Sequence, residues 1–274
     1  MPEPELPEPR TPAGRAGLAA LLEDPRRALI AVDFDGTLAP IVADPAAARA
    51  HPRAPAALSR LAARVGGVAV VTGRPTAQAI SLGDLAGVPG LVVLGHYGLE
   101  RWADGTVTAP PPHPAVAAVR RELPAVLARH GEGAWVEDKG SSVAVHTRRA
   151  PDPPGLFEAL RQPLTELAAR HGLTVEPGRL VLELRPPGVD KGAALRSLVR
   201  EREPSCLLFA GDDLGDLAAY DAVDELRAHG LPGLLVCSGS EEVVALAERA
   251  DLVVAGPAGV VALFEALARA LDSA

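Results

Sequence analysis

Aromatic side chains, cysteines and surplus basic charge are all scarce in this 274-residue chain. Phe, Trp and Tyr make up 3% of the residues, although the hydrophobic share of 48% is ordinary for a globular protein with a buried core. The formal net charge is −8, whereas nucleic-acid-binding proteins usually carry a basic excess. We therefore expect no nucleic-acid partner, while a local basic pocket for a small anionic substrate stays compatible with this composition.

Long apolar segments are also missing. No apolar run approaches the ~18 residues that a membrane span needs. The N-terminal MPEPELPEPR is acidic and rich in proline, unlike the basic and apolar start of a signal peptide. Two cysteines, Cys206 and Cys237, lie inside apolar runs, which favours buried, reduced thiols. We expect a soluble cytoplasmic monomer with no membrane partner.

Short apolar runs alternate with helix-like segments in two parts of the chain. This alternation predicts an α/β fold, with a parallel sheet and helices on both of its faces. The expected core covers residues 12–104 and 188–274, and residues 1–11 are expected to form a disordered tail. The strand-like runs are ALIAVDFDGTL, GVAVVTGRP, LVVLGHYGLE, CLLFAGDD, GLLVCSG and ADLVVAG.

The segment between these two parts, residues 105–187, follows a different pattern. A helix-like segment precedes two strand-like runs, AWVEDKG and SSVAVHTR, which are separated by a Gly-Ser turn. A second helix-like segment precedes LTVEPGRLVLELRP, which reads as a hairpin with Pro-Gly at its turn. We expect residues 105–187 to form a smaller α+β domain inserted into the core.

Two acidic residues at the end of the first strand carry the strongest chemical signal. Asp33 and Asp35 are two apart, so in an extended backbone both face the same side. Open α/β sheets bind ligands at that carboxyl edge. Two carboxylates so close repel each other unless a cation intervenes, and magnesium prefers such oxygen ligands. The alternative is a solvated Asp-Gly turn.

Two further motifs offer positive groups for a phosphate. Thr72-Gly73-Arg74 follows a strand and opens a helix, where N–H groups and a hydroxyl bind phosphate readily, although a plain helix cap is the alternative. Lys191 stands at the start of a later helix, the unfavourable end of the helix dipole for a cation. An anionic partner or a nearby acidic cluster would resolve that conflict, and an ordinary surface lysine is the alternative.

The loop GDDLGDL, after the apolar run CLLFA, supplies three more carboxylates. Asp212, Asp213 and Asp216 at a strand end suit a magnesium site. Loop aspartates that only cap the next helix are the alternative, above all for Asp216.

The order of these four motifs resembles the haloacid dehalogenase superfamily, in which an acidic DxD loop, a Ser/Thr, a Lys and an acidic pair converge. The segments DFDGTLAPI, GHYGLE, EDKGSSVAVHTR and ELRP look like those of trehalose-6-phosphate phosphatases in particular. The similarity runs through nearly the whole chain from about Leu29. It implies a Rossmann-like core with an inserted cap domain, and a sugar phosphate as the substrate.

The resemblance also implies roles for the core residues. Asp33 would be the nucleophile and a magnesium ligand, and Asp35 the acid and base, with its main-chain carbonyl on the metal. Asp212 would bind the Mg²⁺, with Asp213 and Asp216 as further candidates. Thr72 and Lys191 would neutralise the phosphoryl oxygens, and Arg74 would contact the substrate.

The inserted segment carries candidate sugar-binding residues. Glu137 and Lys139 alternate along one expected strand and share a face, as His146 and Arg148 do on its partner. With Glu183, such a face offers hydrogen bonds to the hydroxyls of a disaccharide, although opposite charges that pair across the strands are the alternative. The resemblance assigns Glu137, Lys139, Arg148 and Glu183 to sugar binding.

One departure separates the chain from the family pattern. The acidic loop commonly reads GDDxTDE, but here Gly215 stands in place of the hydroxyl and Leu217 in place of the last carboxylate. The implied activity is hydrolysis of trehalose 6-phosphate to trehalose and phosphate. The alternatives are another capped phosphatase, acting on sucrose phosphate or mannosyl-3-phosphoglycerate, and a non-catalytic sugar-phosphate sensor.

Overall fold

The computed structural model describes residues 6–42, 44–111, 113–130, 132–178, 180–239 and 244–272. The chain divides into two compact units. The core unit comprises residues 1–108 and 190–274, and the inserted unit comprises residues 109–189. The breaks expected from the sequence lie at 104–105 and 187–188.

The core unit is built on one eight-stranded sheet. Its strands, in spatial order, are β12 (Leu252–Ala255), β11 (Gly233–Gly239), β10 (Cys206–Gly211), β1 (Ala28–Val32), β2 (Gly67–Val71), β3 (Val92–Gly95), β4 (Glu100–Ala103) and β5 (Thr106–Thr108). From β12 to β3 every neighbouring pair is parallel, as the alternating pattern predicts. The last two strands are antiparallel additions at one edge.

Those two edge strands differ from the expectation. The run LVVLGHYGLE was expected to be one strand, but β3 ends at Gly95 and β4 begins at Glu100, with a tight turn between them. Residues 106–108, which precede a run rich in proline, form β5 and pair with β4. The chain therefore reverses directly after β3 instead of crossing over through a helix.

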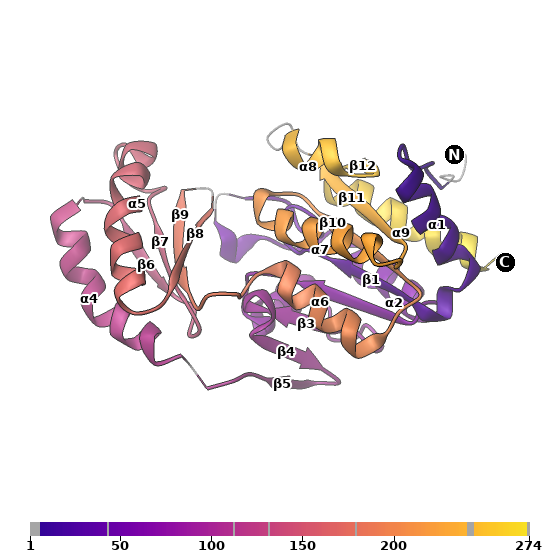
Figure 1. Cartoon of the computed structure of the whole chain (residues 1–274), viewed down its shortest axis with the longest axis horizontal. Coiled ribbons are helices and arrows are strands. Elements are labelled where there is room, and N and C mark those ends of the chain that lie inside the picture. The colour runs from indigo at the N-terminus through magenta and orange to yellow at the C-terminus, as the bar shows by residue number, and fades with distance from the viewer. Residues whose placement is uncertain are drawn as a thin grey trace. The chain divides into compact units, whose positions relative to one another are not determined.

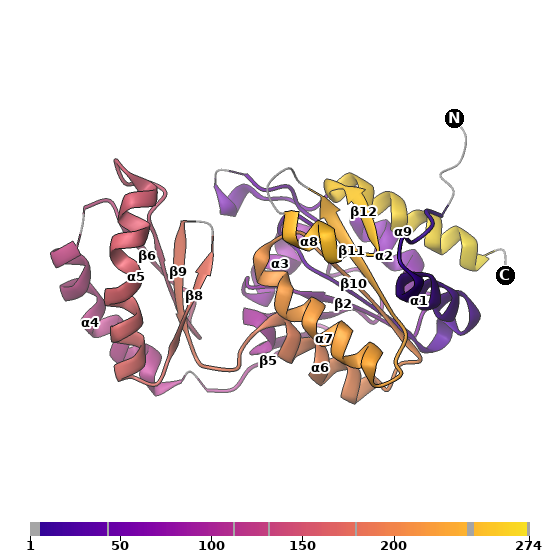
Figure 2. The ribbon, with the colours of Figure 1, turned by 45° about the horizontal axis from the view of Figure 1, so that its top comes forward.

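Helices cover both faces of the core sheet because each inner strand is apolar on both sides. Along β1, Ile30 and Val32 pack into one apolar cluster, and Leu29 and Ala31 into the other. The first cluster includes α1 (Pro12–Glu23), α2 (Ala54–Ala62), α3 (Thr76–Gly83) and α9 (Gly256–Asp272). The second includes α6 (Lys191–Arg202), α7 (Leu217–Ala228) and α8 (Val244–Arg249), so the sheet lies between two helical layers (Figure 2).

The N-terminal segment is tied to the core earlier than expected. Residues 1–5 of the expected tail lie outside the described residues. The Arg10 N–H donates to the Asp251 carbonyl at 2.9 Å, and the Thr11 hydroxyl caps α1 by accepting the Gly14 N–H at 2.9 Å. The expectation of a disordered tail is therefore wrong for Arg10 and Thr11.

The inserted unit has its own four-stranded antiparallel sheet, covered on one face by two helices (Figure 1). The strand order is β6 (Trp135–Asp138), β7 (Val143–His146), β9 (Val181–Arg185) and β8 (Thr174–Gly178), and the helices are α4 (Pro114–His130) and α5 (Pro153–Arg170). Val143, Val145, Leu182 and Leu184 form an apolar cluster with residues of both helices. The alternate positions of these strands form the opposite face, which is largely polar.

Two details of this unit correct the sequence expectation. Pro177 and Gly178 were expected at the second hairpin turn, but they pair with Leu182 and Val181 inside the ladder, so the turn follows them. Strand β7 ends at His146, so Arg148 lies in the following turn and not on the strand face expected for it.

The remaining expectations concern cysteines and membranes. Cys206 and Cys237 are both buried and free, as the apolar runs around them predict. Among the helices of the described ranges, none combines the length and the apolar character that crossing a bilayer requires.

Candidate active site

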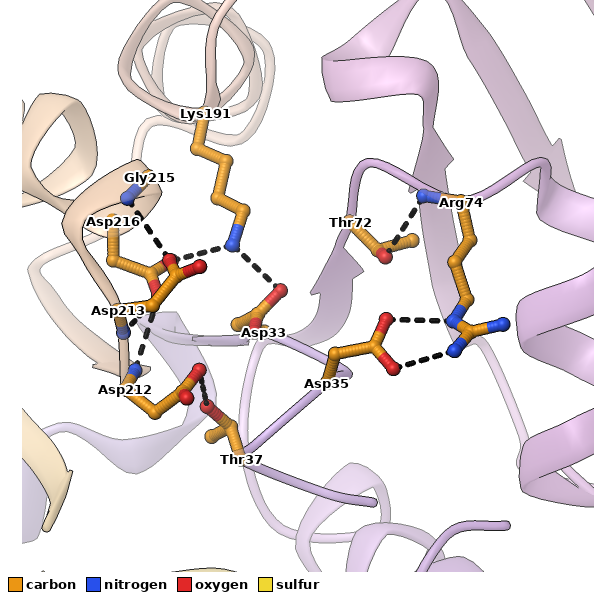
Figure 3. Close-up of polar contacts among 10 residues, drawn as sticks. All are labelled: Asp33, Asp35, Thr37, Thr72, Arg74, Lys191, Asp212, Asp213, Gly215 and Asp216. Atoms are coloured by element: carbon orange, nitrogen blue, oxygen red, sulfur yellow. Dashed lines mark hydrogen bonds and ion pairs between the residues drawn. The ribbon is translucent and has the colours of Figure 1, made fainter. Parts of the chain in front are cut away.

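Three strand ends and one helix start meet at the carboxyl edge of the core sheet. β1 leads into Asp33, and its neighbours β2 and β10 lead into Thr72 and Asp212. Lys191, the first residue of α6, points into the same place (Figure 3). The parallel topology therefore gathers four motifs that are far apart in the sequence.

Lys191 lies between two of the acidic groups. Its Nζ is 2.7 Å from Asp33 Oδ1 and 2.7 Å from Asp216 Oδ1, and its side chain is 6% exposed. Although burial lowers the pKa of Lys191, the charges of Asp216 and Asp33 raise it well above the usual range. A cation at a helix N-terminus is thus stabilised by carboxylates, and the surface-lysine alternative is wrong.

The aspartates of the acidic loop make different contacts, and capping does not account for all of them. Asp216 is fully buried, and its Oδ2 accepts the N–H groups of Asp212 at 3.0 Å and Asp213 at 3.3 Å. It makes no side-chain cap on α7, but its contact with the Asp213 N–H is half of a capping box on the short helix Leu214–Asp216, so the capping alternative holds in part. Asp213 is the capping residue, since its Oδ1 accepts the Gly215 N–H at 2.9 Å.

The departure from GDDxTDE fits this arrangement. A side chain at Gly215 would bring a Cβ to 3.1 Å from Asp213 Oδ1, a tight contact with the capping carboxylate. Leu217 packs against the apolar cluster between the sheet and α7. The loop therefore keeps its shape through Asp213 and Asp216 without a hydroxyl at 215 or a carboxylate at 217.

Three of the buried carboxylates form a candidate metal centre. Ligand oxygens of Asp33, Asp212 and Asp216 all lie within 4.8 Å of one another. Burial raises the pKa of Asp33 well above its usual range against the effect of Lys191, and burial with the charges of Asp216 and Asp213 raises the pKa of Asp212 to about 8. One lysine leaves this cluster with surplus negative charge, so the residues present fit a divalent cation that prefers oxygen ligands.

Asp35 belongs to a different contact. Its carboxylate faces Arg74, with 2.6 Å from Nε to Oδ2 and 2.6 Å from Nη2 to Oδ1 (Figure 3). Of the two carboxylates expected to share one side, Asp33 thus points to Lys191 and Asp35 to the loop after β2. Thr72 is buried, and its Oγ1 accepts the Arg74 N–H at 3.1 Å.

One residue that supports the loop after Asp35 was not predicted from the sequence. Ser238, at the carboxyl end of β11, donates its hydroxyl to the Gly36 carbonyl at 2.7 Å and so holds the loop after Asp35. Gly36 has φ +78°, and a Cβ there would lie 1.9 Å from Asp212 Oδ2. The signal in the sequence was a hydroxyl residue ending the apolar run GLLVCSG at the same sheet edge.

The polar face of the inserted sheet carries Glu137 and Glu183. Lys139 was expected on the same strand as Glu137, but β6 ends at Asp138, so Lys139 lies in the following turn and only its side chain reaches Glu183. Glu137, Ala144 and Glu183 are aligned across β6, β7 and β9, so the two glutamates share a face. Lys139 Nζ is 2.8 Å from Glu183 Oε2, and the Ser142 hydroxyl donates to Glu183 Oε1 at 2.5 Å.

The same face carries an aromatic pair. Glu137 Oε2 is 2.9 Å from His146 Nε2, and the His146 ring stacks on Trp135 with 4.0 Å between ring centres. Lys139 and Glu183 therefore form an ion pair on this face, as the alternative of paired opposite charges held. Arg148 is exposed in the turn after β7.

Comparison with known proteins places these observations in a family. The fold is shared with a haloacid dehalogenase-like hydrolase from Bacteroides thetaiotaomicron, with a TM-score of 0.62 at 17% identity over 86% of this chain and 98% of that one. The fold is therefore haloacid dehalogenase-like. The family model described as Trehalose-phosphatase matches residues 31–251, and the chain belongs to that family.

Two relatives define the likeness further. The trehalose-phosphate phosphatase of Mycobacterium marinum is 36% identical over 236 residues, which cover 80% of this chain and 56% of that protein. The chain thus spans little more than half the length of that relative. The solved structure of Aspergillus fumigatus trehalose-6-phosphate phosphatase has a TM-score of 0.67 at 26% identity, covering 96% of this chain and 99% of that one.

Proposed function

We propose that this chain hydrolyses trehalose 6-phosphate to trehalose and phosphate through an aspartyl-phosphate at Asp33. Membership in the trehalose-phosphatase family supports the reaction class and the sugar phosphate. The observation that carries the proposal is Lys191, buried at 2.7 Å from both Asp33 and Asp216. A phosphoryl group brought to Asp33 would meet this cation at once, and such charge stabilisation supplies most of the catalysis in phosphoryl transfer.

The reaction proceeds in two displacements. In the first, an Asp33 carboxylate oxygen forms a bond to phosphorus while the bond from phosphorus to the sugar oxygen breaks, and Asp35 gives its proton to that oxygen. In the second, a water oxygen forms a bond to phosphorus as the bond to Asp33 breaks, and Asp35 takes the proton of the water. Asp33 and Asp35 thus return to their starting states, and phosphate leaves.

Mg²⁺ is the proposed cofactor. Asp33, Asp212 and the main-chain carbonyl of Asp35 would hold it, and Asp216 and Asp213 are the further candidates. The ion, when bound, would neutralise charge on the phosphoryl oxygens. Thr72 and Lys191 supply the remaining positive and hydrogen-bonding groups.

The inserted unit is proposed to determine sugar specificity. The residues proposed to hydrogen-bond the disaccharide hydroxyls are Glu137, Lys139, Arg148 and Glu183. Arg74 of the core unit is a further candidate for a substrate contact. The short contacts within Lys139–Glu183 and Glu137–His146 support this because they hold the polar groups in fixed positions on one face. A cytoplasmic location and a monomeric state stay predictions.

Phosphate release from a panel of sugar phosphates tests the proposal. We expect trehalose 6-phosphate to be hydrolysed fastest, EDTA to stop release, and Asp33→Asn to abolish turnover in a chain that still folds. A preference for sucrose phosphate or mannosyl-3-phosphoglycerate would assign the chain to another capped phosphatase. Binding of sugar phosphate without any release would assign it to a sensor.

A further inference from the structure

The loops after β1 and β2 are joined by a bidentate ion pair between Asp35 and Arg74. Both carboxylate oxygens of Asp35 accept from Arg74, each at 2.6 Å. The Arg74 side chain is 11% exposed, whereas that of Asp35 is 34% exposed. The guanidinium is thus enclosed by protein, while the carboxyl group stays open to an incoming ligand.

Arg74 is itself held from three sides. Its N–H donates to Thr72 Oγ1 at 3.1 Å, and its carbonyl accepts the His96 N–H at 2.9 Å. Its guanidinium carbon lies 5.6 Å from the centre of the buried Phe34 ring, within the range of a cation–π contact. The backbone of Arg74 is therefore fixed by hydrogen bonds, and its guanidinium group is packed against Phe34.

The GHYGLE motif, residues 95–100, braces this loop with an unusual backbone. His96 and Tyr97 have φ of +48° and +58°, a left-handed conformation that residues with a side chain rarely adopt. The Tyr97 N–H donates to the Thr72 carbonyl at 2.9 Å. A Cβ at Gly73 would lie 2.6 Å from Tyr97 Oη, so the tyrosine ring covers that glycine. The hydrogen bonds and the tyrosine ring of this turn hold the loop from Thr72 to Arg74 in place.

We propose that Arg74 is a positioning residue for Asp35, and that the GHYGLE turn fixes Arg74 for this task. The inference rests on the proposed function, in which Asp35 protonates the leaving sugar oxygen. A bidentate fork restricts a carboxyl group to one orientation more strongly than a single hydrogen bond does. A general acid misplaced by about 1 Å loses a large part of its effect.

The choice of leaving group distinguishes a positioning residue for Asp35 from a direct phosphate ligand. A sugar alkoxide needs a proton in order to leave, whereas dinitrophenolate leaves readily without one. Loss of a positioning residue for Asp35 therefore slows transfer from a sugar phosphate far more than transfer from an aryl phosphate. Loss of a phosphate ligand slows both equally.

Rapid-mixing kinetics of Arg74→Gln and Arg74→Lys test this. Single-turnover release of trehalose from trehalose 6-phosphate should fall about 30-fold in Arg74→Gln, and the burst of dinitrophenolate from 2,4-dinitrophenyl phosphate less than about threefold. Arg74→Lys should lie between Arg74→Gln and the wild type, since lysine offers one contact and no fork. Arg101→Gln is the matched control, because Arg101 forms a similar fork with Glu201, at 2.9 and 2.8 Å, on the exposed surface. It should leave both rates unchanged.

A double-mutant cycle with Asp35→Asn completes the test. If Arg74 acts through Asp35, Arg74→Gln should slow trehalose release no further in the Asp35→Asn background. Additive losses, equal losses on both substrates, or a tenfold weaker inhibition by inorganic phosphate would overturn the assignment of Arg74. A wild-type chain that releases neither trehalose nor dinitrophenolate would instead refute the proposed function and, with it, this role. Thermal unfolding of each variant verifies the fold, and Arg74→Lys carries the comparison if Arg74→Gln does not fold.

Discussion

Replacement of Asp212 by Asn should stabilise the metal-free protein, and the gain should depend on pH. The pKa of Asp212 is raised from 3.8 to about 8 by burial and by the neighbouring charges of Asp216 and Asp213. Between about pH 4 and pH 8 the folded protein therefore holds a proton that the unfolded chain has released, so the free energy of unfolding falls as pH rises through this window. Asn keeps the shape of Asp and lacks the charge.

The size of the effect follows from the shift. A pKa raised from 3.8 to about 8 corresponds to ~6 kcal/mol at most. Asp33, Asp212 and Asp216 share the burial and the repulsion that cause it, so one carboxyl accounts for a few kcal/mol. In EDTA at pH 8 we expect Asp212→Asn to raise the free energy of unfolding by ~2 kcal/mol, or Tm by about 5 °C. At pH 4 the gain should vanish, because both forms are then neutral.

Chemical and thermal unfolding at pH 4 and pH 8, in EDTA and in Mg²⁺, measures this. Added Mg²⁺ should stabilise the wild type by mass action and leave Asp212→Asn almost unaffected. Asp104→Asn is the matched control, since that exposed residue lies in the turn between β4 and β5, outside the acidic cluster, and should shift stability little at either pH. A loss of stability in metal-free Asp212→Asn at pH 8, or an equal gain at both pH values, would show that Asp212 is not held protonated by the folded chain.

Three further substitutions test other parts of the site. Lys191→Ala should lower phosphate release at least about 100-fold, because it removes the buried cation beside Asp33, and a mild loss in a phosphate assay would contradict its role. Lys139→Ala should harm trehalose 6-phosphate at least about tenfold more than p-nitrophenyl phosphate, since the proposed sugar contact is absent from the aryl substrate; equal losses would exclude sugar binding there. Ser238→Ala should cost ~1 kcal/mol of stability and a severalfold loss of turnover, because the Gly36 carbonyl loses its buried donor; unchanged unfolding curves would show that this hydrogen bond is dispensable.

Much of the core was predictable because its signals are local. Short apolar runs ending in Asp33, Thr72 and Asp212 predicted parallel strands, and parallel strands bring their carboxyl ends to one edge. The break after Gly95 was not predictable, since left-handed backbone at His96 and Tyr97 is disfavoured for those residue types and is imposed by hydrogen bonds to the neighbouring loop.

Pairing between distant side chains was the second limit. The motif GDDLGDL shows several carboxylates but not which one turns inward. In the structure Asp213 and Asp216 share a capping box, and Asp216 alone of the two is buried against Lys191. Likewise, two residues spaced two apart predict a shared side for Asp33 and Asp35, but the contact of Asp35 with Arg74 arises from a loop 39 residues away. Such pairings depend on tertiary packing, which leaves no periodic trace in the sequence.

The most direct test is chemical trapping of the covalent intermediate. The protein is mixed with trehalose 6-phosphate and Mg²⁺, quenched in acid within the first turnover, treated with borohydride and digested for mass spectrometry. Reduction of an acyl phosphate converts that aspartate into homoserine, and we predict this change at Asp33 in the wild type, with none in the presence of EDTA. Homoserine at Asp35 or Asp212, or phosphate release with every aspartate unmodified, would contradict the account.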